Sequence, residues 1–130
     1  MQTMQQRRAK QALSAIQKAL SDEPGADFQK AFKAYVSEMP AMIHMSGLGQ
    51  AAAFYRSKGN GADPKARARR RVYDLLSGWL CEPGQPYQDQ TDLLVGITTE
   101  NMQTYRLAQA EAMAYMDWAK KFATAFIESD

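Results

Sequence analysis

The chain has 130 residues, of which 45 % are hydrophobic, which fits one globular domain with a buried core. No apolar run approaches the roughly 20 residues of a membrane span, and no apolar segment follows the basic N-terminus as in a signal peptide. The single cysteine, Cys81, excludes an internal disulfide and favours a reducing compartment. We therefore expect a soluble cytoplasmic protein with no membrane partner.

The first half of the chain has the spacing of three helices. Thr3 and Gln6 fit a capping box at the start of a helix that ends by Ser21. Asp27 is the expected N-cap of a second helix, which Pro40 should stop or kink because proline lacks a backbone N–H. Ser46 can cap a third helix running from Gly47 to about Lys58.

The second half has the spacing of three more helices. Asp63-Pro64 pairs an N-cap residue with proline at the first helical position, and that helix should reach about Leu80. Residues 81–90 read as a loop, and residues 92–98 as a short helix. Thr98-Thr99 is the expected cap of the last helix.

The longest predicted helix runs from about Thr99 to Glu128. Seven alanines raise its helix propensity, and its other face carries Arg106, Asp117, Lys120 and Lys121. The rest of the chain should fold against its apolar stripe, giving an all-α, compact single-domain bundle of about six helices with a long C-terminal helix. The stripe consists of Tyr105, Ala108, Ala112, Tyr115, Ala119, Phe122, Ala123 and Phe126, with Trp118 on its flank.

The residues give little support to catalysis or metal binding. His44 is the only histidine, and we expect it to be a partly buried structural residue. His44 and Cys81 lie too far apart in sequence to form a metal-ligand pattern, and no nucleophile motif is present. We therefore predict no enzyme activity, no metal, no cofactor and no small-molecule substrate.

Two features allow both a functional and a structural interpretation. Glu111 lies on the apolar edge of the last helix, where a carboxylate must be paired. It could be a general acid or base, or a structural ion pair or cap, which we favour. Gly47 and Gly49 could let helix N–H groups approach a phosphate, or could serve close packing of helices.

Charge provides the best functional lead from the residues alone. The formal net charge is only +2, yet residues 56–71 hold seven basic residues and one acidic residue, a charge of +6. Arg67, Arg70 and Arg71 share one helix face beside Lys58, with Asp74 spaced to pair with Arg70. Such a face suits phosphate contact, but a protein-interaction surface fits the charges equally well.

Several segments together resemble a known family. The stretches TMQQRRA (3–9), MPAMI (39–43), GLGQAAAF (47–54), YRLA (105–108) and WAKKFA (118–123) are similar, in order and spacing, to the small all-helical subunit of the type III-B CRISPR Cmr effector complex. The resemblance spans nearly the whole chain. The region from Gly59 to Arg71 carries no family motif, so the arginine run is a feature of this sequence.

The resemblance implies a role rather than a reaction. Small subunits would stack with copies of themselves into a filament beside the other Cmr subunits. That filament would line the channel where target RNA pairs with guide RNA, in antiviral defence. Target cleavage would belong to other subunits, so this subunit would be non-catalytic.

The family pattern also implies which residues contact RNA. Its basic positions match Arg7, Arg8, Arg106, Lys120 and Lys121, which become candidate contacts to the RNA backbone, mainly of the target strand. Lys58, Arg67, Arg70 and Arg71 are candidates from charge alone. Gly47, Gly49, Glu111 and Trp118 are expected to be structural. The alternative function is a purely structural adaptor between protein subunits, without direct nucleic-acid contact.

Overall fold

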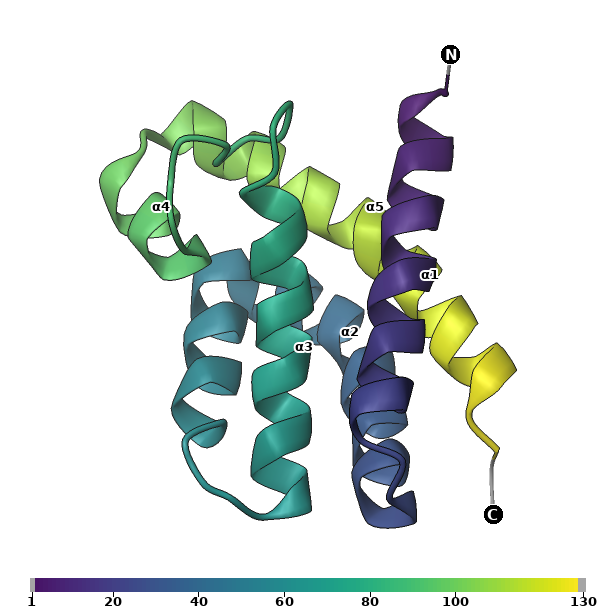
Figure 1. The fold of residues 1–130 in the computed structure, drawn as a ribbon. Coiled ribbons are helices and arrows are strands. Elements are labelled where there is room, and N and C mark those ends of the chain that lie inside the picture. The colour runs from purple at the N-terminus through teal and green to yellow at the C-terminus, as the bar shows by residue number, and fades with distance from the viewer. Residues whose placement is uncertain (1, 129–130) are drawn as a thin grey trace.

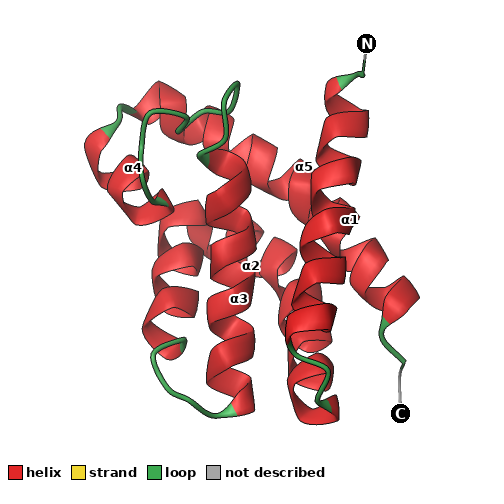
Figure 2. Ribbon diagram, in the orientation of Figure 1, coloured by secondary structure: helices red, strands yellow, loops and turns green. Residues whose placement is uncertain are grey.

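The computed structural model describes residues 2–128, which form five α-helices and, within that range, no strand (Figures 1 and 2). The predicted all-α class is therefore confirmed. The expected count of about six helices is too high, because residues 26–58 form one element. The helices are α1 (Met4–Asp22), α2 (Ala26–Lys58), α3 (Pro64–Leu80), α4 (Leu93–Thr99) and α5 (Met102–Phe126).

Two of the predicted helix starts are confirmed. The Thr3 hydroxyl accepts from the Gln6 N–H at 3.1 Å, and the Gln6 side chain accepts from the Thr3 N–H at 2.9 Å, completing the capping box of α1. Asp63 is the N-cap of α3, with proline at the first helical position. The start of α1 rests on the capping box, and the start of α3 on the proline that follows Asp63, whose fixed φ suits a first helical position. Both are local features, which sequence patterns describe well.

Two other predicted caps are wrong. Gly25 rather than Asp27 is the N-cap of α2, and Asp27 lies in the first turn, where its charge still suits the helix dipole. Asn101 rather than Thr98-Thr99 caps α5, because α4 continues through Thr99. The Asn101 Oδ1 accepts from the Thr104 N–H at 2.9 Å.

The predicted stop or kink of the second helix at Pro40 is wrong, whereas the predicted start of a new helix at Gly47 coincides with the break inside α2. The helix continues through Pro40 and breaks at Gly47, whose φ of 85° and ψ of 157° are non-helical. Val36, Met39 and Ile43 flank the proline and are fully buried. Their spacing of three and four residues keeps them on one face only if the chain stays helical, so burial outweighs the hydrogen bond lost at Pro40.

The core lies between α2 and α3 and extends to the places where α5 crosses α1, α2 and α3. In Figure 1 the second half of α2 runs antiparallel beside α3, and α5 passes diagonally behind α3 and α1. Ala108, Ala112, Ala119 and Ala123 of α5 are fully buried, so their small side chains allow close approach. The Trp79 ring of α3 stacks on the Tyr115 ring of α5 at 5.4 Å.

The structure corrects two expectations about burial. Phe126 was expected on the buried stripe, but half of it (50 %) is exposed. It is the last residue of α5, at the edge of the helix packing. His44 is exposed rather than partly buried, since it lies on the outer side of α2 next to the buried Ile43.

Candidate nucleic-acid interface

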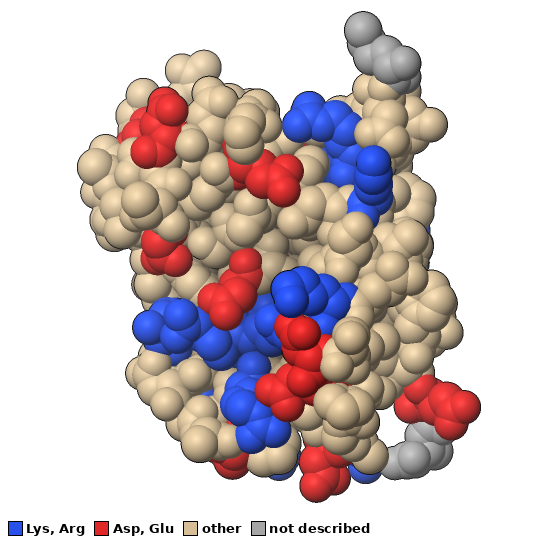
Figure 3. Space-filling model, in the orientation of Figure 1, with Lys and Arg blue, Asp and Glu red and all other residues tan. Residues whose placement is uncertain are grey.

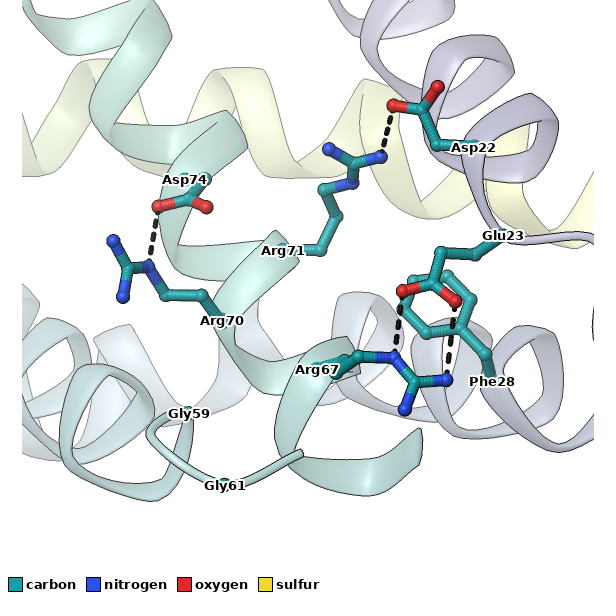
Figure 4. A pocket seen from close by; sticks show the side chains of 9 residues that line it. All are labelled: Asp22, Glu23, Phe28, Gly59, Gly61, Arg67, Arg70, Arg71 and Asp74. Atoms are coloured by element: carbon teal, nitrogen blue, oxygen red, sulfur yellow. Dashed lines mark hydrogen bonds and ion pairs between the residues drawn. The ribbon is translucent and has the colours of Figure 1, made fainter. Parts of the chain in front are cut away.

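Three arginines of the basic run line one pocket of about 370 Å³ between α1, α3 and the loop after α2 (Figure 4). Three arginines from one face of α3 reach this pocket, because positions 67, 70 and 71 lie within about one helical turn. Figure 3 shows basic and acidic side chains alternating over the lower part of this face. The lining residues are Asp22, Glu23, Phe28, Gly59, Gly61, Arg67, Arg70, Arg71 and Asp74.

Each of these arginines is ion-paired. Arg67 donates from Nε and Nη2 to the two carboxylate oxygens of Glu23, at 2.9 and 3.2 Å. Arg71 Nη2 donates to Asp22 Oδ2 at 2.6 Å. The formal charges of the three arginines and the three acids of the pocket therefore cancel.

The pair within α3 was predicted, and the two pairs to α1 were not. Arg70 Nε donates to Asp74 Oδ1 at 2.9 Å, which confirms the expected i,i+4 contact. These contacts raise the pKa of Arg67 and Arg70, and hydrogen bonds from Arg71 and Lys18 lower the pKa of Asp22. Both directions of shift favour the charged forms of Arg67, Arg70 and Asp22, and so favour these ion pairs.

Arg8 and Glu111 form a cross-helix contact rather than an open site. Arg8 donates from Nε at 2.5 Å and from Nη2 at 2.9 Å to the two oxygens of the Glu111 carboxylate. The Trp79 Nε1–H donates to the same carboxylate at 2.9 Å. One carboxylate thus links α1, α3 and α5, and its hydrogen bond with Arg8 raises the pKa of that guanidinium, which holds its proton more firmly than usual.

The basic candidates on α5 lie on a different side of the molecule. Arg106, Lys120 and Lys121 are exposed, while the opposite side of the helix faces α1, α2 and α3. No carboxylate within residues 2–128 lies within ion-pair distance of Arg106 or Lys120. The Lys121 Nζ lies 5.8 Å from the centre of the Trp118 ring, which stacks on Phe122.

The two remaining basic candidates contact neutral groups. Arg7 Nη2 donates to the Pro83 carbonyl at 3.4 Å, beside Gly84. The Lys58 Nζ lies 5.8 Å from the centre of the Phe54 ring. The structure therefore brings Arg67, Arg70 and Arg71 together, and it does not bring them together with the α5 residues.

Gly47 and Gly49 lie against α5. The Leu48 N–H donates to Gln109 Oε1 at 2.9 Å, and the Gly49 N–H donates to the Tyr105 hydroxyl at 2.8 Å. A Cβ on Gly47 would stand 3.2 Å from that hydroxyl. Side chains of α5 thus accept hydrogen bonds from the N–H groups at the start of the second half of α2. These are the N–H groups that the sequence suggested for phosphate binding.

A comparison with models of protein families identifies the family of this chain. The profile of the Cmr5 family, described as CRISPR-associated protein, matches residues 4–126. The chain belongs to the Cmr5 family of CRISPR-associated proteins. Cmr5 membership makes it a subunit of the type III-B CRISPR Cmr complex.

A solved structure has the same fold as this Cmr5-family chain. The crystal structure of a CRISPR-associated Cmr5 family protein from Thermus thermophilus superimposes with a TM-score of 0.74 at 24 % sequence identity. The match covers 98 % of this chain and 100 % of that one. None of the curated proteins compared with the chain matches it. Within residues 2–128, no helix is long and apolar enough to cross a membrane.

Sequence reasoning did not single out Arg69. Its guanidinium lies 4.1 Å from the centre of the Tyr35 ring, 4.9 Å from Phe54 and 5.1 Å from Tyr55. These rings come from both halves of α2, so one cation joins α3 to α2 on either side of the break at Gly47. One sequence feature sets Arg69 apart: by helical spacing it lies on a different face of α3 from Arg67, Arg70 and Arg71.

Proposed function

We propose that this Cmr5-family chain is a non-catalytic subunit that stacks with copies of itself in the small-subunit filament of the Cmr complex. In that filament, the outer face of α5 contacts the RNA backbone, mainly of the target strand, in the channel where target RNA pairs with guide RNA. Family membership supports the role as a Cmr subunit. The charges of α5 support the choice of the contacting face.

The outer face of α5 favours phosphate contact because its basic groups are available. Arg106, Lys120 and Lys121 are exposed, and Asp117 is the one acidic residue of α5 on that side. Positions 106 and 120 lie about 21 Å apart along the helix axis, far enough to contact phosphates of several successive nucleotides. The arginines of α3 are a weaker choice, since acids of the same pocket neutralise them.

A purely structural adaptor is the second candidate. It is favoured by exposed apolar residues of α5, since Met102 is 63 %, Leu107 60 % and Phe126 50 % exposed. Such side chains suit contact with neighbouring protein subunits. An adaptor would hold these subunits without contacting nucleic acid.

The test is binding of the purified chain to labelled single-stranded RNA and to guide-paired RNA across a salt series. One variant carries Arg106→Ala, Lys120→Ala and Lys121→Ala. The matched control carries Arg67→Ala, Arg70→Ala and Arg71→Ala, which removes the same formal charge. Circular dichroism checks that both variants keep the helical fold.

The α5 variant should bind RNA more weakly and with a shallower salt dependence, by about 0.7 to 0.9 in the logarithmic slope for each phosphate that the protein no longer neutralises. The α3 control should change binding less. Wild-type affinity in the α5 variant would contradict the proposed RNA face. A filament multiplies weak single contacts, so the assay must also use low salt and protein concentrations high enough to detect one such contact. If none of the three proteins binds RNA under these conditions, the adaptor is favoured.

A further inference from the structure

The arginine pocket of α3 retains hydrogen-bond donors that its acids do not use. Arg70 contacts Asp74 through Nε, and Arg71 contacts Asp22 through Nη2. Each guanidinium carries five N–H donors in a fixed plane, so both Nη groups of Arg70 and the Nε and Nη1 groups of Arg71 remain. Arg67 differs, because Glu23 and the Ala62 carbonyl engage all three of its nitrogens.

The acids that neutralise Arg67 and Arg71 come from one short segment. Asp22 is the last residue of α1, and Glu23 is its C-cap, directly before Pro24. Figure 4 shows both side chains entering the pocket from α1, opposite the arginines of α3. The acids that neutralise Arg67 and Arg71 therefore act from outside α3.

The contacts made by these acids are of the kind that a phosphate can replace. The Asp22 side chain is 41 % exposed and that of Glu23 28 % exposed. A single contact as open to water as that between Arg71 and Asp22 contributes little net free energy, since water solvates the separated charges well. The two hydrogen bonds between Arg67 and Glu23 make that pair the stronger of the two. Asp22 also accepts from Lys18 Nζ at 3.1 Å, so it keeps a cationic partner when Arg71 leaves it.

We propose that Asp22 and Glu23 mask an anion site formed by Arg67, Arg70 and Arg71, which takes a phosphate once these carboxylates are displaced. The pocket of about 370 Å³ has room for a phosphate group, and guanidinium groups bind phosphate oxygens in a bidentate manner. The inference rests on the proposed function for the source of this phosphate, which is the RNA backbone. Inorganic phosphate has the same chemistry and is the competing source.

The experiment removes the mask in the full chain. The unmasked variant carries Asp22→Asn and Glu23→Gln, which keep the side-chain shapes and remove two negative charges. The matched control carries Asp89→Asn and Glu100→Gln, which remove the same charge from exposed positions outside the pocket. Affinity for the labelled single-stranded RNA is measured across the salt series, with a third protein that adds Arg67→Ala and Arg71→Ala to the unmasked variant.

We expect the unmasked variant to bind RNA more tightly, on the order of fivefold for each released arginine, with a steeper salt dependence. The control should bind like wild type, and loss of Arg67 and Arg71 should abolish the gain. Equal affinity of the unmasked variant and wild type would overturn the inference. So would a gain shared by the control, or one that survives loss of the arginines.

A direct readout identifies the source of the phosphate. The Nε–Hε NMR signals of Arg67 and Arg71 should shift in the unmasked variant when RNA is added, and excess inorganic phosphate should compete. Shifts caused by inorganic phosphate but not by RNA would overturn the RNA backbone as the source. If the double variant loses its circular dichroism signal, Glu23→Gln alone, which releases Arg67, takes the same test.

The two proposals fail in different ways. The proposed function fails if substitution of Arg106, Lys120 and Lys121 leaves wild-type binding unchanged. The masked site fails if Asp22→Asn with Glu23→Gln brings no gain. Adding the unmasking substitutions to the α5 variant separates them further, since a masked site should then restore part of the lost RNA binding.

Discussion

Glu111 offers the sharpest test of the packing that holds α1, α3 and α5 together. Its side chain is 12 % exposed and accepts two hydrogen bonds from Arg8 and one from Trp79. In Glu111→Gln the amide keeps one acceptor oxygen and turns an N–H₂ group toward other donors. One or two donors then lose their partner, and the Arg8 charge loses its counter-charge.

The expected cost follows from burial. Removing one partner of a fully buried pair costs about 3–5 kcal/mol. Because 21 % of the Arg8 side chain is exposed and water can solvate it, we expect Glu111→Gln to lower the free energy of unfolding by about 2–3 kcal/mol. The matched control is Asp74→Asn, where both partners are more than 40 % exposed, and it should cost less than about 1 kcal/mol.

Urea unfolding followed by circular dichroism measures both changes. A double-mutant cycle with Arg8→Met isolates the coupling between Arg8 and Glu111, which should exceed that between Arg70 and Asp74. Equal costs for Glu111→Gln and Asp74→Asn would refute the reasoning. The carboxylate would then have a role other than joining the helices, and the interpretation as a general acid or base would regain weight.

Three further changes test local packing, each by urea unfolding. Gly47→Ala should destabilise the chain by about 1–3 kcal/mol, because the φ and ψ of Gly47 are accessible only to glycine. The control Gly78→Ala, where a Cβ meets nothing within 4 Å, should not destabilise it. Equal effects of the two substitutions would contradict this reasoning. Arg69→Lys should cost about 1–2 kcal/mol, since lysine cannot stack a planar cation on its three aromatic neighbours, and an unchanged midpoint would contradict that role. Tyr87→Phe should cost nothing at neutral pH, because the buried Tyr87 hydroxyl lacks a hydrogen-bond partner within residues 2–128. Burial raises the pKa of Tyr87 to about 12. Above about pH 10 the Tyr87 hydroxyl therefore loses its proton in the unfolded chain before it does so in the folded one, and the free energy of unfolding falls. Tyr87→Phe should reduce this loss of stability.

The sequence predicted the features that depend on neighbouring residues. The capping box of Thr3 and Gln6, the start of α3 at Asp63-Pro64 and the pair between Arg70 and Asp74 each join residues no more than four positions apart. The buried alanines of α5 follow from helical spacing alone. Local geometry fixes these features whatever the rest of the chain does.

Features that depend on distant residues were missed. The acids that neutralise Arg67 and Arg71 lie 44 and 49 positions away, so the charge of the run alone gave a misleading picture of an open basic face. The predicted stop or kink at Pro40 is absent because tertiary burial keeps the proline turn helical, while Tyr105 and Gln109 of α5 bind the N–H groups exposed by the break at Gly47. Neither outcome can be obtained from spacing without knowing which helices meet.

The most direct test of the central claim uses the assembled Cmr complex. A target RNA carrying photoreactive uridines is paired with the guide and irradiated, and cross-linked peptides of this subunit are identified by mass spectrometry. We predict cross-links to the outer face of α5, between Met102 and Phe126, and their loss when Arg106, Lys120 and Lys121 are replaced. A complex that retains this subunit but shows target cross-links only on other subunits would contradict RNA contact and support the adaptor.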